Sequence, residues 1–102
     1  VYAVIRGIGT SSDGRSKSVY APVPEGQARA LRKAYEVAGY GPETVSLLEA
    51  HGTATKAGDA AEIKGLKLVF EESGREDRQW CALGSIKSQI GHTKAAAGAA
   101  GL

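Results

Sequence analysis

Several residue types are scarce in this chain of 102 residues, and their scarcity excludes whole classes of protein. Cys81 is the one cysteine, so no disulfide can form within the chain, and a reducing compartment suits it. No apolar run approaches the roughly 20 residues that span a membrane, and the N-terminus lacks the pattern of a signal peptide. We therefore expect a cytoplasmic protein without a membrane anchor.

Net charge is also small, at +2, and aromatic residues make up only 6% of the chain. Lys and Arg are scattered without forming a stripe, which argues against nucleic acid as a partner. The length allows one domain at most. The chain has no methionine, begins inside the apolar run 1–5 and stops inside a small-residue helical pattern at Leu102. We interpret residues 1–102 as one partial domain of a longer protein.

Three apolar segments predict strands, at residues 1–8, 45–50 and 80–86. Each is followed by a segment with helical spacing, so the predicted order is β-α-β-α-β-α. Strands that alternate with helices predict a mainly parallel sheet, and the apolar second strand predicts cover by helices on both of its faces.

Capping residues locate the three predicted helices. The first runs through residues 28–38 and should end at Gly39. The second should begin at Asp59, with Glu62 closing a capping box and Ile63, Leu66, Val69 and Phe70 forming its apolar stripe. The third, residues 94–102 after Thr93, has almost no polar face, which predicts burial on every side.

The two histidines, His51 and His92, each lie in a loop rich in Gly, Ser and Thr beside an apolar strand segment. Loops at the ends of parallel strands meet at one edge of a sheet, so we expect the imidazoles within roughly 10 Å of each other. Two imidazoles there could donate hydrogen bonds to a developing oxyanion. The alternatives are two unrelated structural histidines, or a zinc site with Cys81 as third ligand, although the spacing matches no standard zinc pattern.

Both histidine segments resemble the histidine motifs of the β-ketoacyl synthase, or ketosynthase, family. The first match runs from His51-Gly52-Thr53 to Glu62, and the second runs from residue 84 through Lys87 and His92 to residue 98. Three residues depart from the usual pattern outside the catalytic positions: Ala54, Ala60 and Gln89. Gln89 with Thr93-Lys94 resembles the synthases of polyunsaturated fatty acids and related polyketides.

This resemblance implies a thiolase-like α/β fold and a role for each motif residue. His51 and His92 would serve decarboxylation of a malonyl unit and stabilise the enolate and thioester oxyanions. Lys87 would be the motif lysine, with Glu62 as its ion-pair partner. Thr53 and Thr55 would bind the phosphopantetheine arm of acyl carrier protein, although ordinary loop hydrogen bonds would also explain them.

Neither histidine segment contains a nucleophile, and the surroundings of Cys81 do not match the nucleophile turn of the family. We interpret Cys81 as a small buried apolar residue. The chain is thus expected to be part of the C-terminal half of a condensing enzyme, an acyltransferase, and to be inactive alone. Its partners would be the rest of the ketosynthase, which is a homodimer by resemblance, and acyl carrier protein. The alternative is a separate α/β module that binds an acyl thioester or phosphopantetheine without catalysis.

Overall fold

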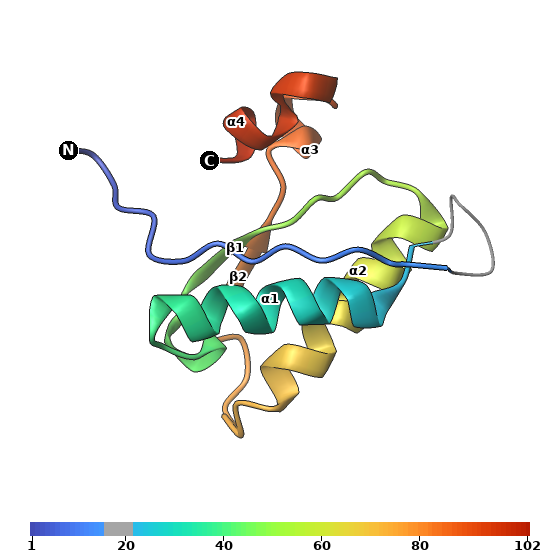
Figure 1. The fold of residues 1–102 in the computed structure, drawn as a ribbon. Helices are drawn as coiled ribbons and strands as arrows, with labels where there is room; N and C mark the ends of the chain where they lie inside the picture. The colour runs from blue at the N-terminus through green and yellow to red at the C-terminus, as the bar shows by residue number, and fades with distance from the viewer. Residues whose placement is uncertain (16–21) are drawn as a thin grey trace.

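The computed structural model describes residues 1–15 and 22–102, and Figure 1 shows how their helices and strands are arranged. The elements in chain order are α1 (Pro24–Ala38), η1 (Pro42–Thr44), β1 (Leu47–Glu49), α2 (Lys56–Glu71), β2 (Ala82–Gly84), α3 (Lys87–Ile90), η2 (Lys94–Ala96) and α4 (Ala97–Gly101).

Strands β1 and β2 form a two-stranded parallel sheet and are connected through α2. Leu47 pairs with Ala82 and Glu49 with Gly84, so both strands end at the same edge. The predicted parallel pairing is confirmed, but each strand is shorter than its apolar run. Ladder bonds define a strand, whereas an apolar run also includes the residues that lead into the loops.

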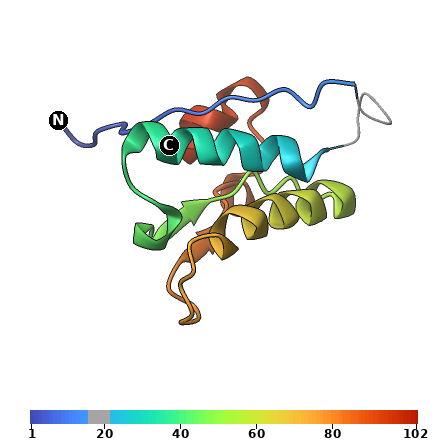
Figure 2. The same ribbon diagram turned by 60° about the horizontal axis from the view of Figure 1, so that its bottom comes forward.

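Helices α1 and α2 lie side by side on one side of the strands, as Figures 1 and 2 show together. Small residues let the two backbones approach: a Cβ on Gly65 would lie 3.0 Å from the carbonyl oxygen of Pro24. Among residues 1–15 and 22–102, the buried apolar side chains are Ala28, Ala61 and Val69. The predicted stripe on α2 is therefore wrong in part, because Ile63 is 39% exposed.

The first predicted strand is wrong, because residues 1–14 form neither strand nor helix in the structure. This segment runs along α1 as an irregular extended chain (Figure 1). Gly7 and Gly9 lie directly on the α1 backbone: a Cβ on Gly7 would overlap the carbonyl oxygen of Ala34, and one on Gly9 that of Ala30. The two glycines thus allow a contact that any side chain would prevent.

Two helix ends test the predicted caps. Gly39 ends α1 in the left-handed conformation, at φ 78°, and its N–H donates to the carbonyl oxygen of Tyr35, which confirms that prediction. The predicted start of the second helix at Asp59 is wrong. Thr55 is the N-cap of α2, and its hydroxyl oxygen accepts a hydrogen bond from the Gly58 N–H at 3.2 Å.

The C-terminal segment contradicts the predicted burial. A single helix was expected from residue 94, but the chain forms η2 and then α4, and neither contains a buried residue. Leu102 is 93% exposed, and Leu47 and Leu83 on the strands are 68% and 55% exposed. The strand predicted at residues 45–50, which contains β1, is therefore not covered on both faces within the described residues.

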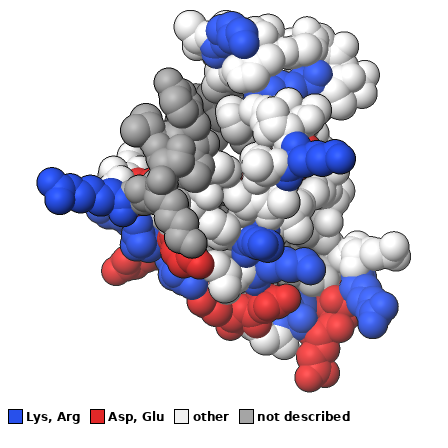
Figure 3. Space-filling model, turned by 90° about the vertical axis from the view of Figure 1, so that its right-hand side faces the viewer, with Lys and Arg blue, Asp and Glu red and all other residues white. Residues whose placement is uncertain are grey.

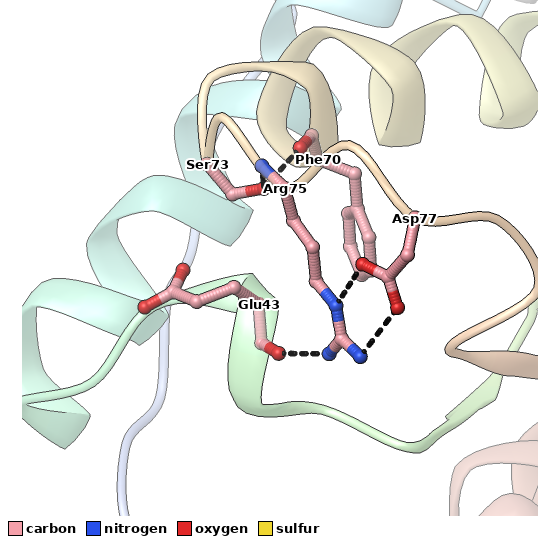
Figure 4. A network of polar contacts seen from close by, with 5 residues as sticks. All are labelled: Glu43, Phe70, Ser73, Arg75 and Asp77. Carbon is pink, nitrogen blue, oxygen red and sulfur yellow. Dashed lines mark hydrogen bonds and ion pairs between the residues drawn. The ribbon is translucent and has the colours of Figure 1, made fainter.

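A group of aromatic and polar side chains anchors the loop between α2 and β2. Trp80 stacks on Phe70, with ring centroids 5.3 Å apart, and the Arg75 guanidinium lies 4.5 Å from the Trp80 ring centre. Arg75 also donates to both carboxylate oxygens of Asp77 and to the carbonyl oxygen of Glu43 at 2.7 Å (Figure 4). These contacts fix the chain just before it enters β2.

Charged side chains of both signs occur together on the surface. On the face in Figure 3 they gather mainly at the lower end, and the upper part is mostly uncharged. Within the described ranges, no helix is both long and apolar enough to cross a bilayer.

Candidate functional site

The edge where β1 and β2 end brings the two histidines together. The ring centroids of His51 and His92 are 5.9 Å apart and their planes meet at 84°, which confirms the expected convergence. Both imidazoles are exposed. Lys87, the first residue of α3, lines a cavity of about 420 Å³ together with His51 and residues of α4. Three residues expected to share a site therefore do lie at one edge.

A hydrogen bond determines which tautomer the neutral ring of His92 adopts. Its Nδ1 accepts a hydrogen bond from the Lys94 N–H at 3.0 Å, so in the neutral ring the proton is on Nε2. Desolvation lowers the pKa of His92 below its ordinary value, and the charges of Lys94 and Lys87 and the nearby His51 lower it further. The neutral imidazole of His92 is therefore favoured near neutral pH, and its Nε2–H donates to no atom of the described residues.

We predict that Lys94→Gln raises the pKa of His92 towards its ordinary value, because the change removes a nearby positive charge but keeps the backbone donor. An NMR titration of the His92 ring measures this, with Lys64→Gln on α2 as the control. An unchanged pKa would show that the charge of Lys94 does not act on His92.

The lowered pKa of His92 also makes the stability of the fold depend on pH. The unfolded chain binds the imidazole proton at higher pH than the folded chain does. The stability that the neutral His92 ring contributes is therefore fully present above the ordinary pKa and is lost as pH falls through the pKa of the folded state.

Glu62 holds the His51 loop against α2. Its Oε1 accepts from the His51 N–H at 2.6 Å and its Oε2 accepts from the Gly52 N–H at 2.9 Å. The two salt bridges among the described residues join other side chains, so the predicted Lys87–Glu62 ion pair is wrong for this chain. Both carboxylate oxygens are occupied by backbone donors. The predicted capping box is also wrong, because Thr55 caps α2.

Sequence reasoning missed a second carboxylate at this edge. Glu49 is the last residue of β1, and its Oε1 accepts a hydrogen bond from the Ile86 N–H at 2.6 Å. The available signal was a charged residue at the end of an otherwise apolar strand. Gly52, at φ 51°, lies against the opposite loop, where a Cβ would be 2.6 Å from the Ser85 hydroxyl oxygen.

Thr53 and Thr55 lie beside His51. Their hydroxyl oxygens are 3.3 Å apart, and both residues line a cavity of about 690 Å³ with His51 and Glu62. Thr55 also caps α2. The loop hydrogen bonds that were considered as an alternative are thus present, and the same residues border a space large enough for a ligand.

Ala54, between these threonines, has a positive φ of 62°. This conformation costs a residue with a side chain roughly 1–2 kcal/mol. We predict that Ala54→Gly stabilises the fold by about 0.5–1 kcal/mol, because relief of this strain exceeds the added backbone entropy of glycine. Chemical denaturation followed by Trp80 fluorescence measures the change. Ala60→Gly, within α2, is the matched control and should lower the free energy of unfolding by about 0.5–1 kcal/mol. If Ala54→Gly lowered the free energy of unfolding by the same amount, Ala54 would be unstrained.

Cys81 lies immediately before β2, and the histidine edge follows the other end of that strand. Ser85 is four positions after Cys81, about 13 Å along an extended chain. The thiol is only half-buried, so the predicted burial of Cys81 is not confirmed, and its sulfur is 3.6 Å from the carbonyl oxygen of Ala82. Within residues 1–15 and 22–102, no three His, Cys, Asp or Glu side chains are grouped as ligands for a metal ion.

Comparison with known proteins agrees with this geometry. Residues 2–102 match the family model described as beta-ketoacyl synthase, C-terminal domain. The whole chain is 48% identical to one subunit of the polyunsaturated fatty acid synthase of Thraustochytrium sp., of which it covers 4%, and 45% identical to polyketide synthase PksL of Bacillus subtilis, of which it covers 2%. The chain therefore spans a small part of these relatives.

Solved structures show the same similarity. The ketosynthase from module 6 of the bacillaene synthase of Bacillus subtilis 168 superposes with a TM-score of 0.88 at 46% identity, over 95% of this chain and 17% of that one. The ketosynthase from module 1 of the bacillaene synthase of Bacillus amyloliquefaciens FZB42 gives a TM-score of 0.91 at 43% identity, over 99% of this chain and 18% of that one. The expected thiolase-like α/β fold is thereby confirmed. The chain belongs to the β-ketoacyl synthase family and corresponds to the C-terminal domain of those enzymes.

Proposed function

We propose that this chain supplies the histidine half of a condensing site. The complete enzyme joins an acyl thioester, held on a cysteine of another segment, to a malonyl unit that loses CO₂ on acyl carrier protein. The observation that carries the proposal is the 5.9 Å separation of the His51 and His92 rings, which lets both address one small thioester group.

The chemistry follows from where charge develops. When CO₂ leaves the malonyl thioester, its bonding electrons move towards the thioester carbonyl and negative charge appears on that oxygen. Donors already oriented towards this oxygen stabilise the transition state without reorganising. His92 fits this role because its Nδ1 accepts from the Lys94 N–H, which leaves Nε2–H as donor.

Other residues of the edge complete the proposed site. Lys87 adds positive charge near His92 and, after desolvation and the charge of Lys94, contributes to the lowered pKa of that imidazole. Glu62 holds the backbone of the His51 loop, because its two carboxylate oxygens accept from the His51 and Gly52 N–H groups. Thr53 and Thr55 are proposed to bind the phosphopantetheine arm in the cavity that they share with His51. The arm is a substrate carrier, and no other cofactor is part of the proposal.

The exposed histidines support a contribution from other parts of the enzyme. An oxyanion site works best when water is excluded, but both imidazoles are open in this chain. We propose that the rest of a homodimeric ketosynthase covers them and provides the nucleophile, and that residues 1–102 form part of its C-terminal domain. The single cysteine is consistent with a cytoplasmic enzyme.

The proposal is tested on the isolated chain and on a hybrid enzyme, the graft, in which this chain replaces the matching segment of a complete ketosynthase. We expect the isolated chain, incubated with acyl- and malonyl-carrier protein, to give no β-ketoacyl product by mass spectrometry. Grafted in place of the matching segment of the module 6 bacillaene ketosynthase, it should restore product formation. Acylation of the host cysteine is measured first and shows that the graft is folded. An acylated graft that forms no product would overturn the proposal, as would a product from the isolated chain that disappears in Cys81→Ser.

The second candidate is binding of an acyl thioester or phosphopantetheine without catalysis. The cavity of about 690 Å³ beside Thr53 and Thr55 favours it. Calorimetric titration of the isolated chain with phosphopantetheine tests binding directly, and binding together with an acylated but inactive graft would favour this candidate over condensation.

A further inference from the structure

Glu49 connects the two loops that carry the histidines. The β1–β2 ladder ends where the Ala50 N–H donates to the carbonyl oxygen of Gly84 at 2.7 Å. After this bond the chains separate, one towards His51 and the other towards α3. The Glu49 side chain extends from β1 to the second chain and accepts the Ile86 N–H at 2.6 Å. Ile86 directly precedes Lys87 in the sequence.

The same side chain contacts the segment that follows His92. A Cβ on Gly101 of α4 would lie 3.3 Å from the Glu49 Cγ, so the α4 backbone packs against this side chain. His92 is located between α3 and α4 in the sequence. Glu49 therefore meets the chain on both sides of His92, through a hydrogen bond at Ile86 before it and through a packing contact at Gly101 after it. Figure 1 shows α3 and α4 together beyond the ends of the strands.

The two carboxylates of the site have different tasks. In the part of the chain that the structure describes, Glu62 accepts from amides of the His51 loop alone, and so fixes that loop to α2. Glu49 binds an amide of the opposite chain, and so fixes the Lys87 and His92 segment to β1. Removal of Glu62 should loosen one histidine loop, whereas removal of Glu49 should change the distance between the two histidines.

We propose that Glu49 is a positioning residue of the condensing site, and that it sets the spacing of His51 and His92 through its hydrogen bond to the Ile86 amide. This inference rests on the proposed function for its catalytic consequence. Its geometric part is independent of catalysis and can be tested on the 102-residue chain alone.

Three substitutions separate hydrogen bonding from charge. Glu49→Gln keeps an oxygen that accepts the Ile86 N–H but removes the charge. Glu49→Asp keeps the charge but is one methylene shorter, and Glu49→Ala removes both. Glu62→Ala and Glu36→Ala, the latter on the exposed side of α1, are the controls.

NMR on the labelled chain gives the readouts: hydrogen exchange of the Ile86 amide and the contact between the His51 and His92 ring protons. We expect Glu49→Ala and Glu49→Asp to speed Ile86 exchange by on the order of tenfold and to weaken the contact between the rings, and Glu49→Gln to preserve both. Glu62→Ala should speed exchange at His51 and Gly52 but leave Ile86 unchanged.

Unchanged Ile86 exchange and ring contact in Glu49→Asp would overturn the proposal even if Glu49→Ala does not fold. Loss of both readouts in Glu49→Gln would also overturn it, since charge would then be the cause. In the grafted enzyme, Glu49→Ala should lower condensation at least tenfold while Glu49→Gln remains near wild type and cysteine acylation is unchanged. If the wild-type graft is acylated but inactive, the proposed function fails while the NMR result still decides the role of Glu49.

Discussion

Replacement of His92 by alanine in the grafted ketosynthase should lower the condensation rate by roughly 10²–10³-fold, the usual loss when one oriented oxyanion donor is removed. His51→Ala should have an effect of similar size, because its ring lies 5.9 Å from that of His92. Steady-state formation of β-ketoacyl product, measured by mass spectrometry, gives both rates.

Two controls keep this result interpretable. Acylation of the host cysteine should proceed at the wild-type rate in each variant, because the histidines are proposed to act on the malonyl unit. Gln89→Ala, an exposed change in the same segment as His92, should leave condensation within about twofold. If His92→Ala lowers the condensation rate by less than fivefold, His92 is not an oxyanion donor.

Gly9→Ala should have the largest effect on stability. Its new Cβ would overlap the carbonyl oxygen of Ala30 and lie 2.6 Å from the Ala34 nitrogen, both part of the rigid α1 backbone. Overpacking of this kind costs about 1–3 kcal/mol. Denaturation followed by Trp80 fluorescence measures the loss, because Trp80 is the one tryptophan in the chain.

Gly98→Ala is the matched control for this prediction. Gly98 lies in α4, where an added methyl group would meet no atom within 4 Å, so alanine there should be neutral or slightly stabilising. If Gly9→Ala were as stable as Gly98→Ala, the N-terminal segment would not pack on α1 in solution.

Local patterns in the sequence were sufficient to predict that α1 and α2 are helices and that β1 pairs in parallel with β2, but not where α2 begins. They failed for residues 1–8, whose β-branched side chains favour a strand but whose backbone does not join the β1–β2 sheet. They also failed for the last helix, where an apolar pattern indicates burial but cannot show which surface supplies it. Strand pairing and helix burial depend on residues that are close in space but distant in the sequence, and a local sequence pattern carries no information about those residues.

The sequence predictions for the site were likewise right for some residues and wrong for others. The motifs located His51, His92 and Lys87 at one edge, because strand ends of a parallel sheet cluster there. They gave Glu62 the wrong partner, since sequence spacing does not distinguish a lysine ammonium from backbone amides as the donor. Glu49 was missed for a related reason: its partner, the Ile86 N–H, is a backbone group 37 residues away.

The most direct measurement of a shared oxyanion site is the rate of CO₂ release from malonyl-carrier protein in the graft, for both single histidine variants and for His51→Ala with His92→Ala. Residues that act as one unit are strongly non-additive. We predict that the double variant releases CO₂ only a few-fold more slowly than either single variant. The shared site would be contradicted if the fold-loss of the CO₂ release rate in the double variant equalled the product of the two single fold-losses. It would also be contradicted if the single variants released CO₂ at the wild-type rate.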